Sequence, residues 1–176
     1  MAGEGILPVS VVPAINLLKF YAFSLSDVPG VVAANNFLSV FNPVGSGRNL
    51  VFYQSIVNAY AGGATTATNS LNIFRTTAAS GGTLITASAV PRFVTSDGPS
   101  VAEVRTGNPT VTTINTTLQG ISPAITTAGA GTSAAGGGTT PGGSSFVCIP
   151  GEGLVMRTTA GDVDQLWNLT FVWSEQ

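Results

Sequence analysis

The residues of this sequence that could do chemistry are few, and the first to consider form the glycine-rich stretch Gly45-Ser46-Gly47-Arg48. A phosphate-binding loop requires the spacing G-x-x-x-x-G-K-[ST] between a strand and a helix, so that backbone N–H groups and a lysine converge on the phosphate. Here an arginine follows Gly47 without a Ser or Thr after it, and the next residues, NLVFY, favour a strand. The preceding stretch FLSVF, residues 37–41, also favours a strand. The sequence therefore predicts a hairpin turn and not a phosphate site.

Nucleophilic catalysis has little support. The sequence contains no histidine, which excludes Ser-His-Asp and Cys-His catalysis and all histidine-based metal sites. Its single cysteine, Cys148, lies in the apolar stretch FVCI and is predicted to be a small core residue. A reactive cysteine needs a base and a charge that stabilises the thiolate, and neither is close in the sequence.

Carboxylates could act as an acid–base pair or as calcium ligands. Asp162 and Asp164, in AGDVDQ, are the only pair that is close in the sequence. They could donate oxygens to Ca²⁺, but EF-hand spacing is absent and another acidic ligand would have to come from elsewhere. A solvated turn is the preferred interpretation. The sequence predicts no enzyme, no cofactor and no metal site.

The arginines are more informative as a set, because each lies within or beside a predicted strand. They are Arg48, Arg75, Arg92, Arg105 and Arg157. Some are expected to pair with Glu103, Glu152 or Asp162, across a sheet or across a subunit boundary. The alternative is that they only keep the sheet edges soluble.

Composition limits the classes of protein to which the chain can belong. Its 176 residues suffice for one domain, and only 8% are charged, against about 25% in ordinary globular proteins. So few charges protect a surface poorly against association, which indicates that much of the surface contacts other chains. The net charge of −2 without a basic patch argues against nucleic-acid binding, and no apolar run is long enough to span a bilayer.

The N-terminal part of the chain is apolar but makes a poor signal peptide. It carries Glu4, no positive charge before its apolar residues, and prolines at positions 8 and 13. We therefore expect synthesis in a cytoplasm. Residues 14–25 could form a short helix or an extended segment with strand character, and the extended form is preferred. Residues 1–34 are predicted to be an N-terminal arm.

The remainder, residues 35–176, is predicted to be an all-β domain. Strands are expected at 36–41, 49–60, 70–76, 83–89, 100–105, 110–117, 145–149, 153–158 and 165–174, separated by Gly, Asn, Pro and Ser clusters. In the last strand the alternation places Trp167, Leu169, Phe171 and Trp173 on one buried face. Residues 128–144 are rich in Gly and small polar residues and are predicted to be a flexible loop.

The order of several stretches resembles a class of tailed-bacteriophage virion proteins. They are FLSVFNPVGSGRNLVFYQSIVNAY, SLNIFRTT, SVAEVRTGNPTVT and CIPGEGLVMRTTAGDVDQLWNLTFVWSEQ. In that class a strand ending in NPxGSG leads into a long strand, and a PGEGLxxRT…W segment closes the domain before an acidic tail. The resemblance covers residues 35–176.

This resemblance implies a jelly-roll-like antiparallel β-sandwich, commonly trimeric, that decorates or cements a capsid. The expected partners are the major capsid protein and two further copies of the chain. The expected location is the capsid surface of a virion, after synthesis in the host cytoplasm. The candidate interface residues are Ile6, Leu7, Val9, Val11, Val12, Arg48, Arg105 and Glu152.

A second hypothesis is a tail- or fibre-associated module that binds host-surface carbohydrate. It would be supported by Trp167 or Trp173 on an exposed face beside Asp162 or Asp164, since sugars stack on aromatic rings next to carboxylates. The strand alternation places both tryptophans on the inner face instead.

Overall fold

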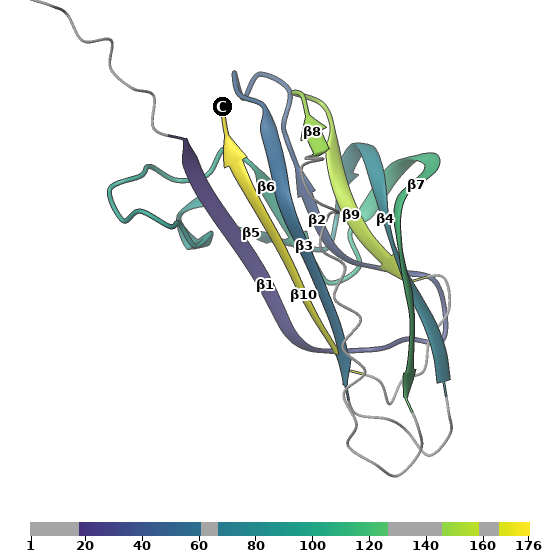
Figure 1. Cartoon of the computed structure of the whole chain (residues 1–176). Helices are drawn as coiled ribbons and strands as arrows, with labels where there is room; N and C mark the ends of the chain where they lie inside the picture. Colours follow the sequence, from purple (N-terminus) through teal and green to yellow (C-terminus); the bar gives the residue numbers. More distant parts are fainter. Residues whose placement is uncertain (1–17, 61–66, 127–145, 159–165) are drawn as a thin grey trace, which may run out of the picture.

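The computed structural model describes residues 18–60, 67–126, 146–158 and 166–176. Its strands form two antiparallel sheets that pack face to face (Figure 1). The first sheet consists, in spatial order, of β1 (Lys19–Pro29), β10 (Leu166–Glu175), β3 (Leu50–Tyr60) and β8 (Phe146–Cys148). The second consists of β5 (Thr83–Ile85), β6 (Glu103–Thr106), β2 (Asn35–Phe41), β9 (Gly153–Thr158), β4 (Ala67–Ser80) and β7 (Thr110–Thr126).

The strand order is that of a jelly roll. When the short additional strands β5 and β6 are set aside, β1 pairs with β10, β2 with β9, β3 with β8, and β4 with β7, all antiparallel. This is the pattern of a long hairpin rolled up so that successive strands alternate between two sheets. The all-β, jelly-roll-like sandwich expected from the sequence is confirmed.

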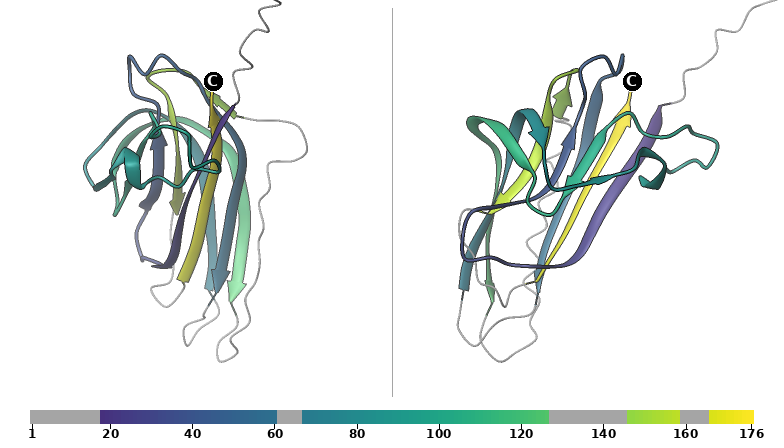
Figure 2. Two further views of the ribbon diagram at one scale, coloured as in Figure 1. Left: turned by 90° about the vertical axis from the view of Figure 1, so that its left-hand side faces the viewer. Right: turned by 180° about the vertical axis from the view of Figure 1, so that it is seen from behind.

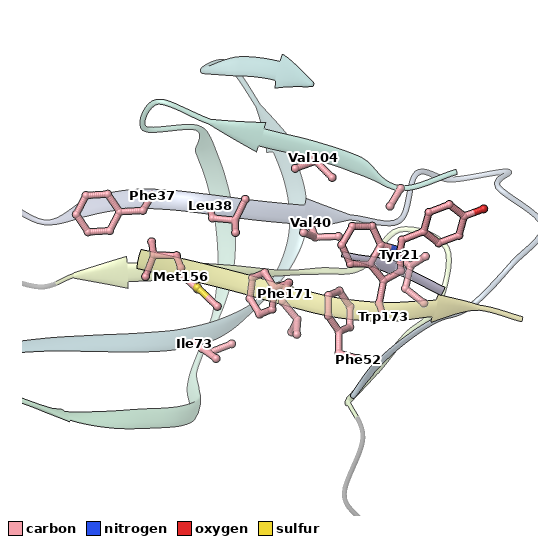
Figure 3. Close-up of a cluster of buried hydrophobic side chains, with 14 of the residues drawn as sticks. Tyr21, Phe37, Leu38, Val40, Phe52, Ile73, Val104, Met156, Phe171 and Trp173 are labelled. Atoms are coloured by element: carbon pink, nitrogen blue, oxygen red, sulfur yellow. The ribbon is translucent and has the colours of Figure 1, made fainter. Parts of the chain in front are cut away.

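Aromatic and aliphatic side chains from both sheets fill the space between them (Figure 3). Tyr21 stacks on Trp173 with ring centroids 6.0 Å apart, and Phe52 packs edge-on against Phe171 at 5.4 Å. Along β10 the predicted alternation is confirmed, because Trp167, Leu169, Phe171 and Trp173 are all buried. The two tryptophans are 2% and 0% exposed.

Several predicted strands differ from the observed ones. The expected strand 83–89 is β5 followed by a short 3₁₀ helix, η1 (Ala87–Ala89), and the expected strand 100–105 begins only at Glu103. Residues 19–29, within the predicted arm, form strand β1, which agrees with the extended alternative and excludes a helix there. Residues 1–17 and the predicted loop 128–144 lie outside the described residues.

The predicted hairpin between residues 37–41 and 49–53 is wrong. The loop does contain a turn, in which the Ser46 N–H donates to the Pro43 carbonyl at 3.1 Å, and Gly45 and Gly47 have φ values of 86° and 68° that favour glycine. However, β2 belongs to the six-stranded sheet and β3 to the four-stranded one. The loop therefore passes from one sheet to the other.

The segment between β5 and β6 covers one edge of the sandwich. Figure 2 shows it passing from the six-stranded sheet to the outer side of β1. There the Ala22 N–H donates to the Pro91 carbonyl at 3.1 Å, and the Phe93 N–H donates to the Phe20 carbonyl at 3.0 Å. These bonds occupy backbone groups of β1 that would otherwise be open to another strand.

Candidate interaction surface

The turn before β9 holds Glu152, one of the predicted interface residues. Ile149-Pro150-Gly151-Glu152 forms a β-turn in which the Glu152 N–H donates to the Ile149 carbonyl at 3.0 Å. Pro150 and Gly151, with φ of 94°, occupy the central positions that a type II turn assigns to proline and glycine. The turn places the carboxylate of Glu152 beside Arg75 of β4, whose Nη1 lies 2.5 Å from Glu152 Oε2. Glu152 therefore has a partner within its own chain.

Asn42 connects this turn to the loop between β2 and β3. Its backbone N–H donates to the Glu152 carbonyl and its carbonyl accepts from the Gly151 N–H, both at 2.8 Å. Its side-chain Nδ2 donates to the carbonyls of Arg48 and Cys148, at 2.7 and 3.0 Å. Asn42 is fully buried, so these bonds hold the two loops together at one end of the sandwich.

Cys148 lies beneath these loops and is a core residue, as the sequence predicts. It is fully buried, and burial raises the pKa of its thiol to about 12, a rise that Arg75 opposes and Glu152 reinforces. At neutral pH the thiol therefore stays protonated, which is the unreactive form.

The other predicted interface residues are spread over different parts of the molecule. Arg105, on β6, bonds to Glu103 Oε2 at 2.9 Å and to the Gly81 carbonyl at 3.0 Å. Pairing of arginines with Glu103 and Glu152 is thus confirmed within one chain. Arg48 lies in the loop between β2 and β3 and makes no ion pair with any described residue. The remaining candidates, Ile6, Leu7, Val9, Val11 and Val12, and the acids Asp162 and Asp164 lie outside the described residues.

A row of aromatic side chains lies on the outer side of the four-stranded sheet. We call Phe93, Phe20 and Tyr53 the aromatic band. The Phe93 and Phe20 ring centroids lie 6.2 Å apart, and those of Phe20 and Tyr53 lie 5.4 Å apart. Phe93 is 64% exposed and Tyr53 40%, while Phe20 between them is half-buried. Aromatic side chains concentrated in this way are typical of protein interfaces.

The aromatic band lies along a row of residues that crosses all strands of this sheet. Phe20 on β1 is opposite Ser174 on β10, Ser174 is opposite Val51 on β3, and Val51 is opposite Val147 on β8. Ser174 and Val51 are buried although they face outward, whereas Val147 is 42% exposed. The Tyr53 hydroxyl is held in place by bonds from Ser174 Oγ and Gln176 Nε2, both 3.3 Å long.

The sequence patterns did not identify this surface. Tyr53 occupies a bulge of β3, because Phe52 pairs with Trp173 and Gln54 pairs with Val172. Phe93 lies on a segment without strand periodicity. The available signal was the stretch KFYAF of residues 19–23, where burial of Tyr21 leaves Phe20 on the other face.

A polar cluster lies at the same end of the sheet as the aromatic band. The buried Glu175 accepts bonds at Oε1 from Ser100 Oγ at 2.6 Å and from the Val101 N–H at 2.8 Å. The Tyr21 hydroxyl donates to the Gly98 carbonyl at 2.9 Å. Burial, and then the charge of Glu175, raises the pKa of Tyr21. The cluster fixes the segment that carries Phe93 against the end of β10.

Within the described ranges, no group of three His, Cys, Asp or Glu side chains could hold a metal ion. The same part of the chain has no helix of the length and hydropathy needed to cross a bilayer. Comparison of the chain with protein-family models, with curated proteins and with solved structures returned no match.

Proposed function

We propose that this protein is a structural protein of a bacteriophage virion that decorates the capsid and stabilises it. In this proposal it acts as a homotrimer, its partner is the major capsid protein, and it lies on the capsid surface after synthesis in the host cytoplasm. It needs no cofactor and carries out no reaction.

The observation that carries the proposal is the aromatic band on a jelly roll with few charges. A surface of this kind is suited to lasting contact with other protein chains. Jelly rolls are found in viral capsid proteins, but also in lectins and cupins, so the fold by itself does not select a function. The sequence resemblance to virion proteins favours the capsid among these.

Carbohydrate binding is less well supported by the observed geometry. Trp167 and Trp173, the side chains that could have stacked on a sugar, are buried in the core. The rings of the aromatic band are tilted by 46° and 72° to their neighbours, so they do not form a flat platform for a sugar chain.

Binding to undecorated capsids tests the proposal. The purified full-length chain should bind such capsids and raise the temperature at which they disrupt. A variant without residues 1–12 should bind more weakly, because these apolar residues are expected to contact a neighbouring chain and to support the trimer, on which several weak capsid contacts act together. Absence of binding by the full-length chain would refute the proposal. Equal binding by the deletion variant would show that residues 1–12 do not contribute to capsid binding.

A further inference from the structure

We propose that the aromatic band of each subunit binds residues 6–13 of a neighbouring copy of this chain. The inference rests on the homotrimer of the proposed function and adds the surface through which its subunits associate. The occupant is thus a segment of the same protein, ILPVSVVP, which is apolar and contains two prolines.

The chemistry of the segment matches that of the aromatic band. Proline-containing segments adopt extended polyproline II structure and dock on aromatic-lined surfaces with little loss of conformational entropy. The aromatic band is a short row, with centroid separations of 6.2 and 5.4 Å. About four residues in polyproline II form, at about 3.1 Å each, would cover it. The segment is therefore long enough to bury the exposed faces of Phe93 and Tyr53.

Charge also favours this pairing. Glu4 is the only charged side chain among residues 1–17. The end of the sheet where the aromatic band lies carries Lys19, Arg48 and Arg92, none of which forms an ion pair with a described residue, together with the acids Asp97 and Glu175, of which Glu175 is buried. The guanidinium of Arg92 instead donates to the Asp97 carbonyl. A neighbour's segment lying on the aromatic band would bring Glu4 towards this group of cations.

The linkage to β1 indicates exchange between subunits. Residues 14–18, AINLL, contain neither glycine nor proline, the residues that most favour a tight turn back onto the same sheet. Residues 14–17 span at most about 14 Å when extended, so the neighbour's aromatic band must lie near the donor's Leu18. A contact in which each subunit gives its segment to the next closes a ring, which is compatible with a trimer.

Substitutions on the aromatic band test the inference in solution without capsids. F93S and Y53S should each weaken self-association about tenfold, measured by sedimentation velocity over a range of concentrations. Phe93 is 64% exposed, so the melting temperature of the dissociated F93S subunit should stay close to the wild-type value. Y53S also removes the ring packing on Phe20 and the hydrogen bonds to the Tyr53 hydroxyl, so its melting temperature should fall. The matched control is L84S, which removes a side chain that is 51% exposed on the edge strand β5. L84S should associate like the wild type.

A disulfide trap identifies the donor chain. In the double variant V11C/Y53C, oxidised at a protein concentration well above that at which Y53S dissociates, chains should be linked into covalent dimers and trimers on a non-reducing denaturing gel. The native Cys148 is fully buried and should not compete. The control V11C/V32C places the second cysteine at a residue that is 76% exposed in the loop between β1 and β2. This control should form no covalent dimers or trimers.

The outcomes separate this inference from the proposed function. Unchanged association of F93S and Y53S, cross-links only within single chains, or a monomeric wild-type protein would overturn the inference. If the wild-type trimer dissociates when Phe93 or Tyr53 is substituted, but the intact trimer does not bind capsids, only the capsid role would be overturned.

Discussion

Arg75 of β4 pairs with Glu152, which directly precedes the neighbouring strand β9 of the same sheet, with Nη1 and Oε2 2.5 Å apart. The same guanidinium nitrogen donates to the Val147 carbonyl on β8 at 2.9 Å, so Arg75 links the six-stranded sheet to the four-stranded one. Both charged side chains are about three-quarters buried, which protects the pair from solvent. From the sequence, Glu152 is one of three acids expected to pair with some of the arginines, across a sheet or across a subunit boundary.

The substitution E152Q should lower the free energy of unfolding by about 1–2 kcal/mol, because it removes a charge-assisted bond to a guanidinium that stays largely buried. Urea unfolding at neutral pH measures this. The control is E103Q, since Glu103 pairs with Arg105 on the same strand and is more exposed. E103Q should lower the free energy of unfolding by less than about 0.5 kcal/mol. Equal effects of the two substitutions would show that the Arg75–Glu152 pair stabilises the fold no more than the more exposed Arg105–Glu103 pair does.

Gly153, at the start of β9, is predicted to tolerate no side chain. A Cβ at this position would lie 2.6 Å from the Val40 carbonyl oxygen and 2.8 Å from Phe41 Cα, and the backbone of β2 cannot move away without disturbing its ladder. G153A should therefore lower stability by about 2–3 kcal/mol. G98A is the control, because the nearest atom to its Cβ would be Lys19 Nζ at 3.9 Å. Wild-type stability of G153A would contradict the packing of β2 on β9.

Burial of Cys148 should make the protein less stable at high pH. Its thiol loses a proton near pH 9 when unfolded but only near pH 12 when folded, so the unfolded state binds fewer protons between these values. Between pH 9 and pH 12 the free energy of unfolding should therefore fall by up to about 1.4 kcal/mol per pH unit. Below pH 9 the Cys148 thiol should not affect it.

The comparison of wild type with C148A isolates this effect. Between pH 8.5 and 10.5, the wild type should lose about 2 kcal/mol more stability than C148A in urea unfolding. Tyr21, whose pKa burial also raises, contributes equally to both proteins. Identical pH dependence of the two would show that the thiol is not buried as described.

Residues 128–144, which lie outside the described residues, are predicted from composition to be dispensable for folding. Replacing them with a short Gly-Ser linker should leave the melting temperature nearly unchanged, because changing the length of a surface loop has a small entropic cost. Scanning calorimetry measures this. A large drop in melting temperature would show that the segment is packed against the domain or against a neighbouring subunit.

Local patterns predict most of the strands after residue 35 but not their partners. The alternation around Trp167 to Trp173 and the Gly, Pro and Asn clusters between strands follow from period-2 geometry and turn chemistry. The sheet to which each strand belongs depends on long-range contacts, which is why β2 and β3 were expected to pair and instead lie in different sheets.

The candidate surface was even less accessible from the sequence. Phe20, Tyr53 and Phe93 are far apart in the chain, and they meet only because β1 and β3 flank β10 and the segment before β6 adds to the edge of β1. A bulge at Tyr53 also breaks the period on which a prediction would depend. Glu152 could be singled out, because its PGEG turn is a local motif.

The position of the protein in assembled virions tests the central claim most directly. Gold-labelled antibodies against the chain, applied to intact purified virions and viewed by electron microscopy, should label the head surface in a regular array. Particles assembled without the protein should be unlabelled and should disrupt at lower temperature. Labelling confined to the tail or its fibres, or no labelling of intact virions, would contradict the proposal of a capsid decoration protein.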